Sequence, residues 1–251
     1  MIALRDVEIA FGERVVARVP ALDLPDGEVV GLAGESGSGK SMTALAVLGL
    51  ARSVGATVRG SITLDGEELV GAPEGRLRAL RGRRIAMIMQ SPRASLNPTM
   101  RLGRYAARAL ALHGIDGGIE AALADVSLDP AILRRYPHQV SGGQAQRFAI
   151  ALAVALRAGV LLADEPTSAL DVTVQAQVVD LLRRVRDEHG TAVLFISHDL
   201  AVVGQLADRV TIMRDGEVVE QGPADRVLRT PSEDYTRALI DAVPVIGKAR
   251  L

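Results

Sequence analysis

The sequence has no cysteine, and aromatic residues are scarce. Its 251 residues include no tryptophan, and the aromatic residues together make up 2%. The lack of cysteine excludes disulfide bonds, a cysteine nucleophile and cysteine-ligated iron–sulfur clusters in this chain. No apolar run is long enough to cross a bilayer as a helix, and Arg5, Asp6 and Glu8 interrupt the start, so no signal peptide is expected. We therefore expect any role at a membrane to come through a partner.

Neither sign of charge is in excess. The chain has 29 basic and 30 acidic residues and a net charge of −1, which argues against a nucleic-acid-binding protein held by bulk electrostatics. The arginine-rich residues 76–84 have no aromatics between them, which favours a solvated helix face over a phosphate or RNA patch. A hydrophobic content of 48% and a length of 251 residues suit one large α/β domain, with or without a subdomain.

A glycine-rich stretch has the pattern G-x-x-x-x-G-K-S, and its residues are Gly34-Glu35-Ser36-Gly37-Ser38-Gly39-Lys40-Ser41. We call it the phosphate loop, because in this pattern backbone N–H groups converge on a phosphate, the lysine reaches the outer phosphates and the serine hydroxyl ligates Mg²⁺. A buried strand expected at 28–33 and a helix expected at 42–50 flank it as such a loop requires. Lys40 is one of two lysines, with Lys248, in a chain that otherwise uses arginine. The setting favours a P-loop nucleotide site over a chance glycine-rich turn.

Two acidic residues follow a continuous apolar run. Residues 160–163 are typical of a strand covered on both faces, and the acidic pair, Asp164 and Glu165, comes next. Because α/β sheets bind ligands at the carboxyl ends of their strands, we expect Asp164 to hold Mg²⁺ and Glu165 to orient or deprotonate the attacking water. The alternative, an acidic first turn of a helix, fits less well because Pro166 follows at once.

A second glycine-containing segment opens a helix expected to run to about residue 156. Ser141 and Gln144 have capping-box spacing, and Gly142 and Gly143 leave the helix N-terminus open to an anion. We call residues 141–144 the glycine cap. A second phosphate site and a plain helix cap both explain it.

Two further polar residues lie at expected strand ends. Gln90 ends a strand expected at 85–89, and His198 follows a strand expected at 191–196. A lone histidine would be assigned to the surface, but in a chain with the phosphate loop and the acidic pair a contact with the γ-phosphate is favoured.

The order of the expected elements indicates an α/β fold with two additions. Short strands at 2–4, 7–9 and 14–19 and a hairpin at 61–69 predict an antiparallel sheet beside the parallel one. Breaks after Gln90 are followed by helices, which predicts a helical insertion at 91–158, so that 1–90 and 159–251 form the core.

Taken together, these motifs resemble those of ATP-binding cassette (ABC) transporter ATPases over nearly the whole chain. The resemblance identifies the phosphate loop as Walker A, the glycine cap as the signature and 160–165 as Walker B with the catalytic glutamate. It adds a Q-loop at Gln90, a D-loop at 168–171 and a switch at His198. It implies one ABC ATPase domain at 1–251, with a P-loop NTPase (RecA-like) parallel-sheet core, an N-terminal antiparallel β subdomain and an inserted α-helical signature subdomain.

The resemblance also implies the ligands and the roles of the site residues. ATP and Mg²⁺ would bind, with Glu165, His198 and Gln90 in catalytic roles, and with Ser41, Gln90 and Asp164 as the metal ligands. Phe11 stands where the family stacks an aromatic residue, usually tyrosine, on adenine. The other implied nucleotide contacts are Gly34, Glu35, Ser36, Gly37, Ser38, Gly39, Lys40, Ser41, Met42, Ser141, Gly142, Gly143, Gln144 and Asp171.

The resemblance implies partners as well. Two such subunits face head to tail in this family, so ATP at Lys40 of one would be closed by Ser141 and Gly143 of the other. The partner would be a second homologous ATPase, in a heterodimer or a homodimer. Two integral-membrane permease subunits and, indirectly, an extracytoplasmic solute-binding protein would complete the assembly. The chain would lie peripherally on the cytoplasmic face of the membrane, and no nucleic-acid partner is expected.

A finer resemblance is to the branch that imports peptides and nickel. It rests on Gln90–Pro98, Tyr136–Gln139, Asp171–Gln177 and Tyr235–Leu239. Peptide importers of this branch often continue into a cysteine-bearing extension, whereas this sequence ends at Leu251 without cysteine, so the expected cargo is nickel or a metallophore-bound metal. Import of dipeptides or oligopeptides, and a soluble cassette protein of a phosphonate-degrading complex, remain as alternatives.

Overall fold

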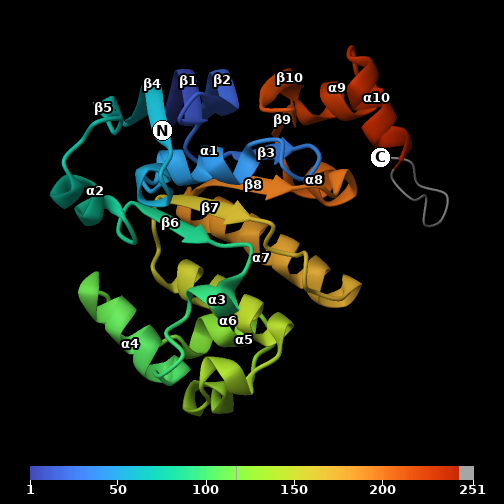
Figure 1. The fold of residues 1–251 in the computed structure, drawn as a ribbon. Helices are drawn as coiled ribbons and strands as arrows, with labels where there is room; N and C mark the ends of the chain where they lie inside the picture. Colours follow the sequence, from blue (N-terminus) through green and yellow to red (C-terminus); the bar gives the residue numbers. More distant parts are fainter. Residues whose placement is uncertain (117, 243–251) are drawn as a thin grey trace. The chain divides into compact units, whose positions relative to one another are not determined.

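The computed structural model describes residues 1–116 and 118–242, in two compact units (Figure 1). Unit 1 comprises Met1–Ala79 and Ala192–Leu251, and unit 2 comprises Leu80–Thr191. The insertion predicted at 91–158 lies within unit 2, which also contains two strands and a long helix. The division into a core and an insertion with those boundaries stays a prediction.

Unit 1 contains the phosphate loop and the strands that lead to it. Its strands are β1 (Ile2–Phe11), β2 (Arg14–Leu24), β3 (Val29–Ala33), β4 (Thr57–Leu64), β5 (Glu67–Glu68), β8 (Ala192–Ser197), β9 (Arg209–Arg214) and β10 (Glu217–Pro223). Its helices are α1 (Lys40–Val47), η1 (Ala51–Val54), α8 (Leu200–Leu206), α9 (Ala224–Arg229) and α10 (Asp234–Asp241), with α2 (Glu74–Leu80) at the boundary.

The strands of unit 1 are ordered β5-β4-β1-β2-β10-β9-β3-β8. β1 pairs antiparallel with both β2 and β4, and these blue and cyan strands lie side by side in Figure 1. β3 pairs parallel with both β8 and β9, and every residue of β3 and β8 is buried, as expected for strands covered on both faces. The predicted combination of antiparallel strands with a parallel core is therefore present.

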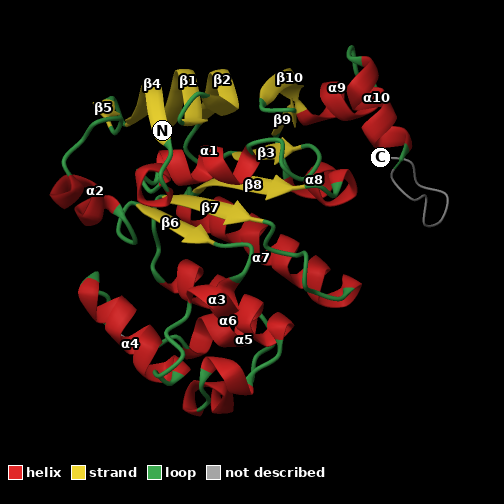
Figure 2. Ribbon diagram, viewed as in Figure 1, coloured by secondary structure: helices red, strands yellow, loops and turns green. Residues whose placement is uncertain are grey.

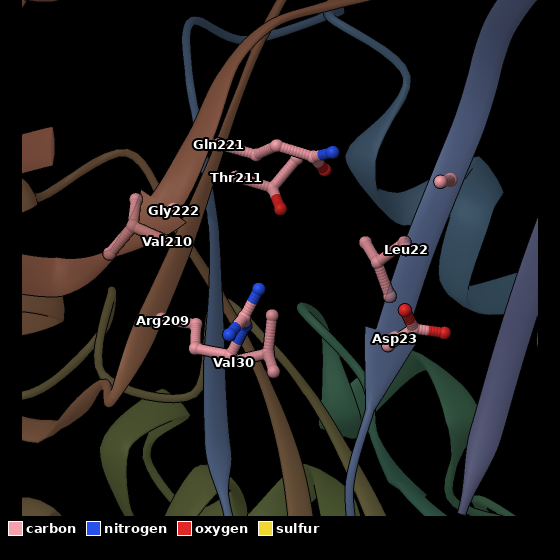
Figure 3. Close-up of a pocket in the computed structure, with 9 residues that line it drawn as sticks. Leu22, Asp23, Val30, Arg209, Val210, Thr211, Gln221 and Gly222 are labelled. Carbon is pink, nitrogen blue, oxygen red and sulfur yellow. The ribbon is translucent and has the colours of Figure 1, made fainter.

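β2 and β10 pair at a single position, Glu217 with Arg18, and then diverge. The gap leaves a cavity of about 40 Å³, lined by Leu22 and Asp23 on one side and by Thr211, Gln221 and their neighbours on the other (Figure 3). Such a cavity has room for water but not for a nucleotide, because small-molecule sites usually measure about 300–1,000 Å³. No residue of the phosphate loop lines it, so we assign it no part in the nucleotide site.

Unit 2 combines two strands with a group of helices. β6 (Ile85–Ile88) and β7 (Val160–Asp164) pair parallel, and α7 (Val172–His189) buries the apolar stripe that its period predicts. The other helices, of which α3 and α5 pack on α6 (Figure 2), are α3 (Pro92–Ser95), α4 (Leu102–Leu112), α5 (Glu120–Asp125), η2 (Pro130–Arg134), η3 (Pro137–Gln139) and α6 (Gly142–Ala155). Among the described residues of both units, no helix has the length and apolarity needed to cross a membrane.

Two element boundaries of unit 1 differ from the sequence predictions for local reasons. The helix predicted at 42–50 is α1, which ends at Val47 because Gly49 adopts φ 66°. The runs predicted at 2–4 and 7–9 form one strand, β1, because pairing with β2 continues on both sides of Asp6; the irregularity at Asp6, with φ 47°, shifts only the register with β4.

Two more boundaries differ around unit 2. The strand predicted at 85–89 ends at Ile88, and Met89, which follows it, is 43% exposed. The arginine-rich stretch 76–84 is helical only to Leu80, because Gly82 adopts φ 77° and reverses the chain toward β6.

Candidate nucleotide-binding site

β3 leads into the phosphate loop, whose backbone requires glycine at two points. Gly34 has φ 143°, and a Cβ there would lie 2.0 Å from the carbonyl oxygen of Met213 on β9. Gly39 has φ 96°, and a Cβ there would lie 2.6 Å from the carbonyl oxygen of Val16 on β2. A side chain at either point would collide with backbone, so the loop packs directly against two other strands of unit 1.

Lys40 is buried at the start of α1, and its ammonium lies within the phosphate loop. Nζ donates to the carbonyl oxygens of Gly34 at 2.8 Å and Glu35 at 2.6 Å, and to Ser38 Oγ at 3.1 Å. Gly39 is the N-cap of α1, and no side chain accepts a capping hydrogen bond there. A buried ammonium beside a helix N-terminus without a side-chain cap fits an anionic ligand such as a phosphate chain.

His198 emerges next to the phosphate loop within unit 1. β3 and β8 are paired up to their last residues, Ala33 with Ser197, so the loop and His198 follow neighbouring strand ends. Asp199 is the N-cap of α8, and its carboxylate accepts a hydrogen bond from the backbone N–H of Ala201 at 2.9 Å. The sequence analysis missed this cap, which fixes the turn that carries His198, although an aspartate before an apolar run is a recognisable signal.

Tyr235 on α10 is a neighbour of the phosphate loop that the sequence analysis did not assign to the site. The central carbon of the Arg214 guanidinium lies 4.8 Å from the centroid of its ring. Burial raises the pKa of the Tyr235 phenol, and the charge of Glu35 in the phosphate loop acts in the same direction. No sequence pattern links positions 35 and 235. Phe11, the residue expected to stack on adenine, ends β1 of the same unit and is 39% exposed.

The acidic pair lies at the end of β7 in unit 2, and Glu165 has an uncommon backbone conformation. Asp164 and Glu165 are both buried. Glu165 has φ 49°, in the left-handed region that residues other than glycine rarely adopt. Ser168 holds this turn by donating to the Glu165 carbonyl from its backbone N–H at 3.3 Å and from its hydroxyl at 3.0 Å. Strain of this kind costs about 1–3 kcal/mol and concentrates at functional sites.

Gln90 and the acidic pair follow neighbouring strands. Ile88 of β6 is opposite Ala163 of β7, so Gln90 and Asp164 lie at the same edge of the two strands of unit 2. Within residues 1–116 and 118–242, no three histidine, aspartate or glutamate side chains gather into a metal site.

The glycine cap has the predicted helix-cap geometry. Ser141 is the N-cap of α6: its Oγ accepts from the Gln144 N–H at 3.2 Å, and Gln144 Oε1 accepts from the Ser141 N–H at 3.0 Å. Ser141 and Gly142 are exposed, and a Cβ on Gly143 would lie 3.2 Å from the carbonyl oxygen of Ala169. The helix cap is confirmed, whereas the second phosphate site stays a prediction.

Two further side chains fix the segment between β7 and α7. Asp171 is the N-cap of α7, and its carboxylate accepts from the Val174 N–H at 3.1 Å. Gln146 on α6 is 1% exposed, and its Nε2 donates to the Pro166 carbonyl at 3.1 Å. The sequence analysis missed Gln146, because the capping signal ends at Gln144 and no periodic pattern marks a polar residue at a buried helix position.

The predicted site residues thus form two groups, each within one unit. Unit 1 holds the phosphate loop with Met42, Phe11 and His198, and unit 2 holds Gln90, the glycine cap, Asp171 and the acidic pair. The second lysine of the chain, Lys248, lies outside the described residues.

The family model and the similar proteins all point to one family, that of ABC transporters. A family model described as "ABC transporter" matches residues 18–168. The Peptidoglycan transport ATP-binding protein YejF of Agrobacterium fabrum is 43% identical over 97% of this chain and 47% of its own length. The Glutathione import ATP-binding protein GsiA of Salmonella typhimurium is 43% identical over 100% of this chain and 43% of its own length. A Brucella abortus protein named for peptide import, BAB2_1052, is 46% identical over 86% of this chain and 68% of its own length.

The chain spans about half the length of the first two of these relatives. Among solved structures, the dimeric post-hydrolysis state of the ATP-binding cassette MJ0796 bound to ADP and Pi is similar, with a TM-score of 0.78 and 27% identity over 89% of this chain and 99% of that one. The fold and the cassette ATPase class predicted from the motifs are both confirmed.

Proposed function

Because the chain belongs to the ABC transporter family, we propose that it is the ATP-hydrolysing subunit of an importer for peptides or peptide-like compounds. One observation carries the choice of cargo: relatives with 43–46% identity over most of this chain are named for peptidoglycan transport, glutathione import and peptide import. The nickel or metallophore cargo, expected from the length and the lack of cysteine, has no such support. Peptides are therefore the better-supported cargo.

The residues of this chain divide the work of binding and hydrolysis. Lys40 and the amides of the phosphate loop bind the phosphates of ATP, and Phe11 stacks on adenine. Ser41, Gln90 and Asp164 would hold Mg²⁺, which would neutralise charge at the outer phosphates. The side chain of Glu165 orients or deprotonates the attacking water, and His198 contacts the γ-phosphate.

The assembly supplies the remaining parts. We expect Ser141 and Gly143 of one cassette to close over ATP bound at Lys40 of a homologous cassette, as a heterodimer or a homodimer. Two permease subunits hold the pair at the cytoplasmic face of the membrane, and a solute-binding protein delivers the cargo from outside. The exposure of Ser141 and Gly142 at the start of α6 supports this arrangement, since a surface that closes a partner's site must be accessible.

A chemistry-blocking variant in living cells tests the function and the cargo together. Glu165→Gln should keep ATP binding, accumulate a closed dimer and reduce hydrolysis by about 10²–10⁴-fold, because a positioned general base is typically worth that much. Uptake of a labelled dipeptide or of labelled glutathione should fall with it, while uptake of radioactive nickel should not change. Glu188→Gln, at an exposed position on α7, is the matched control and should transport normally.

Two outcomes would contradict the proposal. Loss of nickel uptake alone would restore the metal cargo. Unchanged hydrolysis in Glu165→Gln, measured with the partner cassette's own site disabled, would remove Glu165 from the catalytic role.

A further inference from the structure

The signature helix α6 is tied to the turn that carries the catalytic glutamate through one buried hydrogen bond. Gln146 Nε2 donates to the carbonyl oxygen of Pro166 at 3.1 Å, across twenty residues of sequence. The Gln146 side chain is 1% exposed. A buried amide needs a partner, since an unmade hydrogen bond there costs about 1–3 kcal/mol. The contact therefore constrains both α6 and the turn.

The turn held by Gln146 is the one in which Glu165 adopts its left-handed conformation. On one side, Ser168 donates twice to the Glu165 carbonyl, at 3.3 and 3.0 Å. On the other side, Gln146 holds the next carbonyl along the chain, that of Pro166. Two consecutive peptide carbonyls are thus held, one by Ser168 of the turn and one by Gln146 of α6. These hydrogen bonds stabilise the left-handed conformation of Glu165, which is unfavourable for a residue other than glycine.

The first turn of α6 also contacts the same segment. A Cβ on Gly143 would lie 3.2 Å from the Ala169 carbonyl oxygen, so backbone meets backbone at this point. Ser141 and Gln146 lie on one helix about 7.5 Å apart along its axis. A displacement of the exposed end of α6 therefore reaches both Pro166 and Ala169.

We propose that Gln146 is a positioning residue that orients Glu165 for water attack and couples its alignment to the position of the signature helix. This inference rests on the proposed function, because it assumes that Glu165 acts in ATP hydrolysis. Gln146 would act through the Pro166 carbonyl, to which its Nε2 donates. Since the glycine cap is expected to close a partner's nucleotide, Gln146 would link occupancy of the partner's site to catalysis at Glu165 of its own chain.

The test replaces Gln146 with residues of similar size that differ in hydrogen bonding. Gln146→Met removes the donor and keeps the volume, so we expect kcat for ATP to fall by about 10–100-fold, the cost of a misplacement near 1 Å, while KM changes less than two-fold. The KM holds because Gln146 is not one of the residues assigned to ATP binding, and Lys40 is held within its own loop by Gly34, Glu35 and Ser38. The assay uses the transporter complex isolated from its host through a tag on this chain.

Gln146→Glu gives a readout that a merely structural role would not produce. Only the protonated carboxyl can donate to the Pro166 carbonyl, and burial raises the pKa of a glutamate at such a position. The kcat of this variant, relative to wild type, should therefore rise as the pH is lowered from 8 toward 6, whereas that of Gln146→Met should stay low throughout. Gln177→Met is the matched control, because Gln177 of the same unit also has one side-chain hydrogen bond, from Ser127 Oγ at 3.1 Å.

The possible results distinguish failure of the role of Gln146 from failure of the proposed function. Wild-type kcat in Gln146→Met, or identical pH profiles for the Met and Glu variants, would overturn the role of Gln146. If Glu165→Gln is inactive in the same assay while Gln146→Met is normal, the proposed function stands and only this inference fails. If the wild-type chain and Glu165→Gln hydrolyse ATP equally in complexes whose partner cassette's own site is disabled, the proposed catalytic role of Glu165 fails and takes the inference with it.

Discussion

The carbonyl oxygen of Met213 occupies the space that a side chain on Gly34 would need. The two residues are far apart in sequence, at positions 34 and 213, and a Cβ on Gly34 would lie 2.0 Å from that oxygen. The first residue of the phosphate loop is therefore pressed against the end of β9. This contact makes the shape of the loop depend on a strand from the other end of the chain.

Gly34→Ala should displace the phosphate loop and abolish ATP binding. A contact of 2.0 Å to a backbone atom cannot be relieved without moving β9 or the loop, and φ 143° is a region that alanine avoids. Binding of a fluorescent ATP analogue measures the effect. Gly55→Ala is the control, because Gly55 also has positive φ, at 87°, but has open space around it and should leave ATP binding as in wild type. Normal binding by Gly34→Ala would mean that the loop tolerates a different path.

Lys40→Ala should weaken ATP binding by about 10–100-fold, the range for losing one charge-assisted hydrogen bond, and should abolish turnover. Lys40→Arg should also weaken ATP binding and abolish turnover. The ammonium fits between three oxygen atoms at 2.6–3.1 Å, and a planar guanidinium is too wide for that space. Titration calorimetry with ATP and steady-state hydrolysis with the partner present are the measurements. Full activity of Lys40→Arg would show that charge alone suffices there.

Local patterns in the sequence were enough to locate the phosphate loop and the cap at Ser141. Each depends on residues within a few positions of one another: a glycine-lysine-serine spacing and a serine–glutamine pair. The boundaries were wrong where a single residue has positive φ. Pairing with β2 continues past Asp6, with φ 47°, and makes one strand of two predicted ones, and Gly49 with φ 66° ends α1 early.

The relationships that join distant segments had no signal in a single sequence. Gln146 and Pro166 meet because α6 packs beside the turn after β7, and nothing at either position marks the other. The same holds for β2 and β10, which are paired only at Arg18 and Glu217. Tyr235 belongs to a motif that supported the branch assignment, yet its position near Glu35 depends on the whole fold of unit 1.

Glu220→Gln should lower the free energy of unfolding at neutral pH and have less effect in acid. Glu220 is buried on β10, and its carboxylate accepts from the Ser232 N–H at 2.8 Å, the Ser232 hydroxyl at 2.7 Å and the Glu233 N–H at 3.3 Å. Burial alone would raise the pKa of Glu220, but these hydrogen bonds outweigh it and hold the pKa below the ordinary 4.5. They fix the segment that leads into α10.

The sign of the pH dependence follows from that lowered pKa. The ionised Glu220 carboxylate stabilises the folded state fully above its unfolded-state pKa, near 4.5. This stabilisation is lost as the pH falls through the lower folded-state pKa. At pH 7 we expect the free energy of unfolding of Glu220→Gln to be about 1–2 kcal/mol below that of wild type. This difference should shrink below pH 4.5. Urea unfolding at several pH values measures it. Glu217→Gln, which removes an exposed ion pair with Arg18, is the control and should stay within about 0.5 kcal/mol. A difference that grows in acid would contradict the assignment.

Ser141→Arg should leave ATP binding at the chain's own Lys40 intact and impair hydrolysis at the partner's site. Ser141 is exposed at the N-cap of α6, and Lys40 is held by Gly34, Glu35 and Ser38 of its own loop, so we expect the substitution to leave that loop unchanged. In the assembled pair the bulky guanidinium would collide with the contact that closes over the partner's phosphates. Nucleotide binding and steady-state hydrolysis, measured for mixed wild-type and mutant complexes, separate the two sites.

Ser141→Ala separates the collision from the loss of the helix cap. Both substitutions remove the hydroxyl that accepts from the Gln144 N–H, a loss typically worth about 1 kcal/mol, but only arginine adds bulk and charge. Alanine should therefore reduce the partner's hydrolysis much less than arginine, while both variants show a similar loss of stability. Ser53→Arg, at an exposed position of η1, adds the same side chain elsewhere and should keep full activity. Full hydrolysis by a strictly monomeric chain would refute the shared site, and so would loss of the mutant's own ATP binding with the partner's turnover untouched.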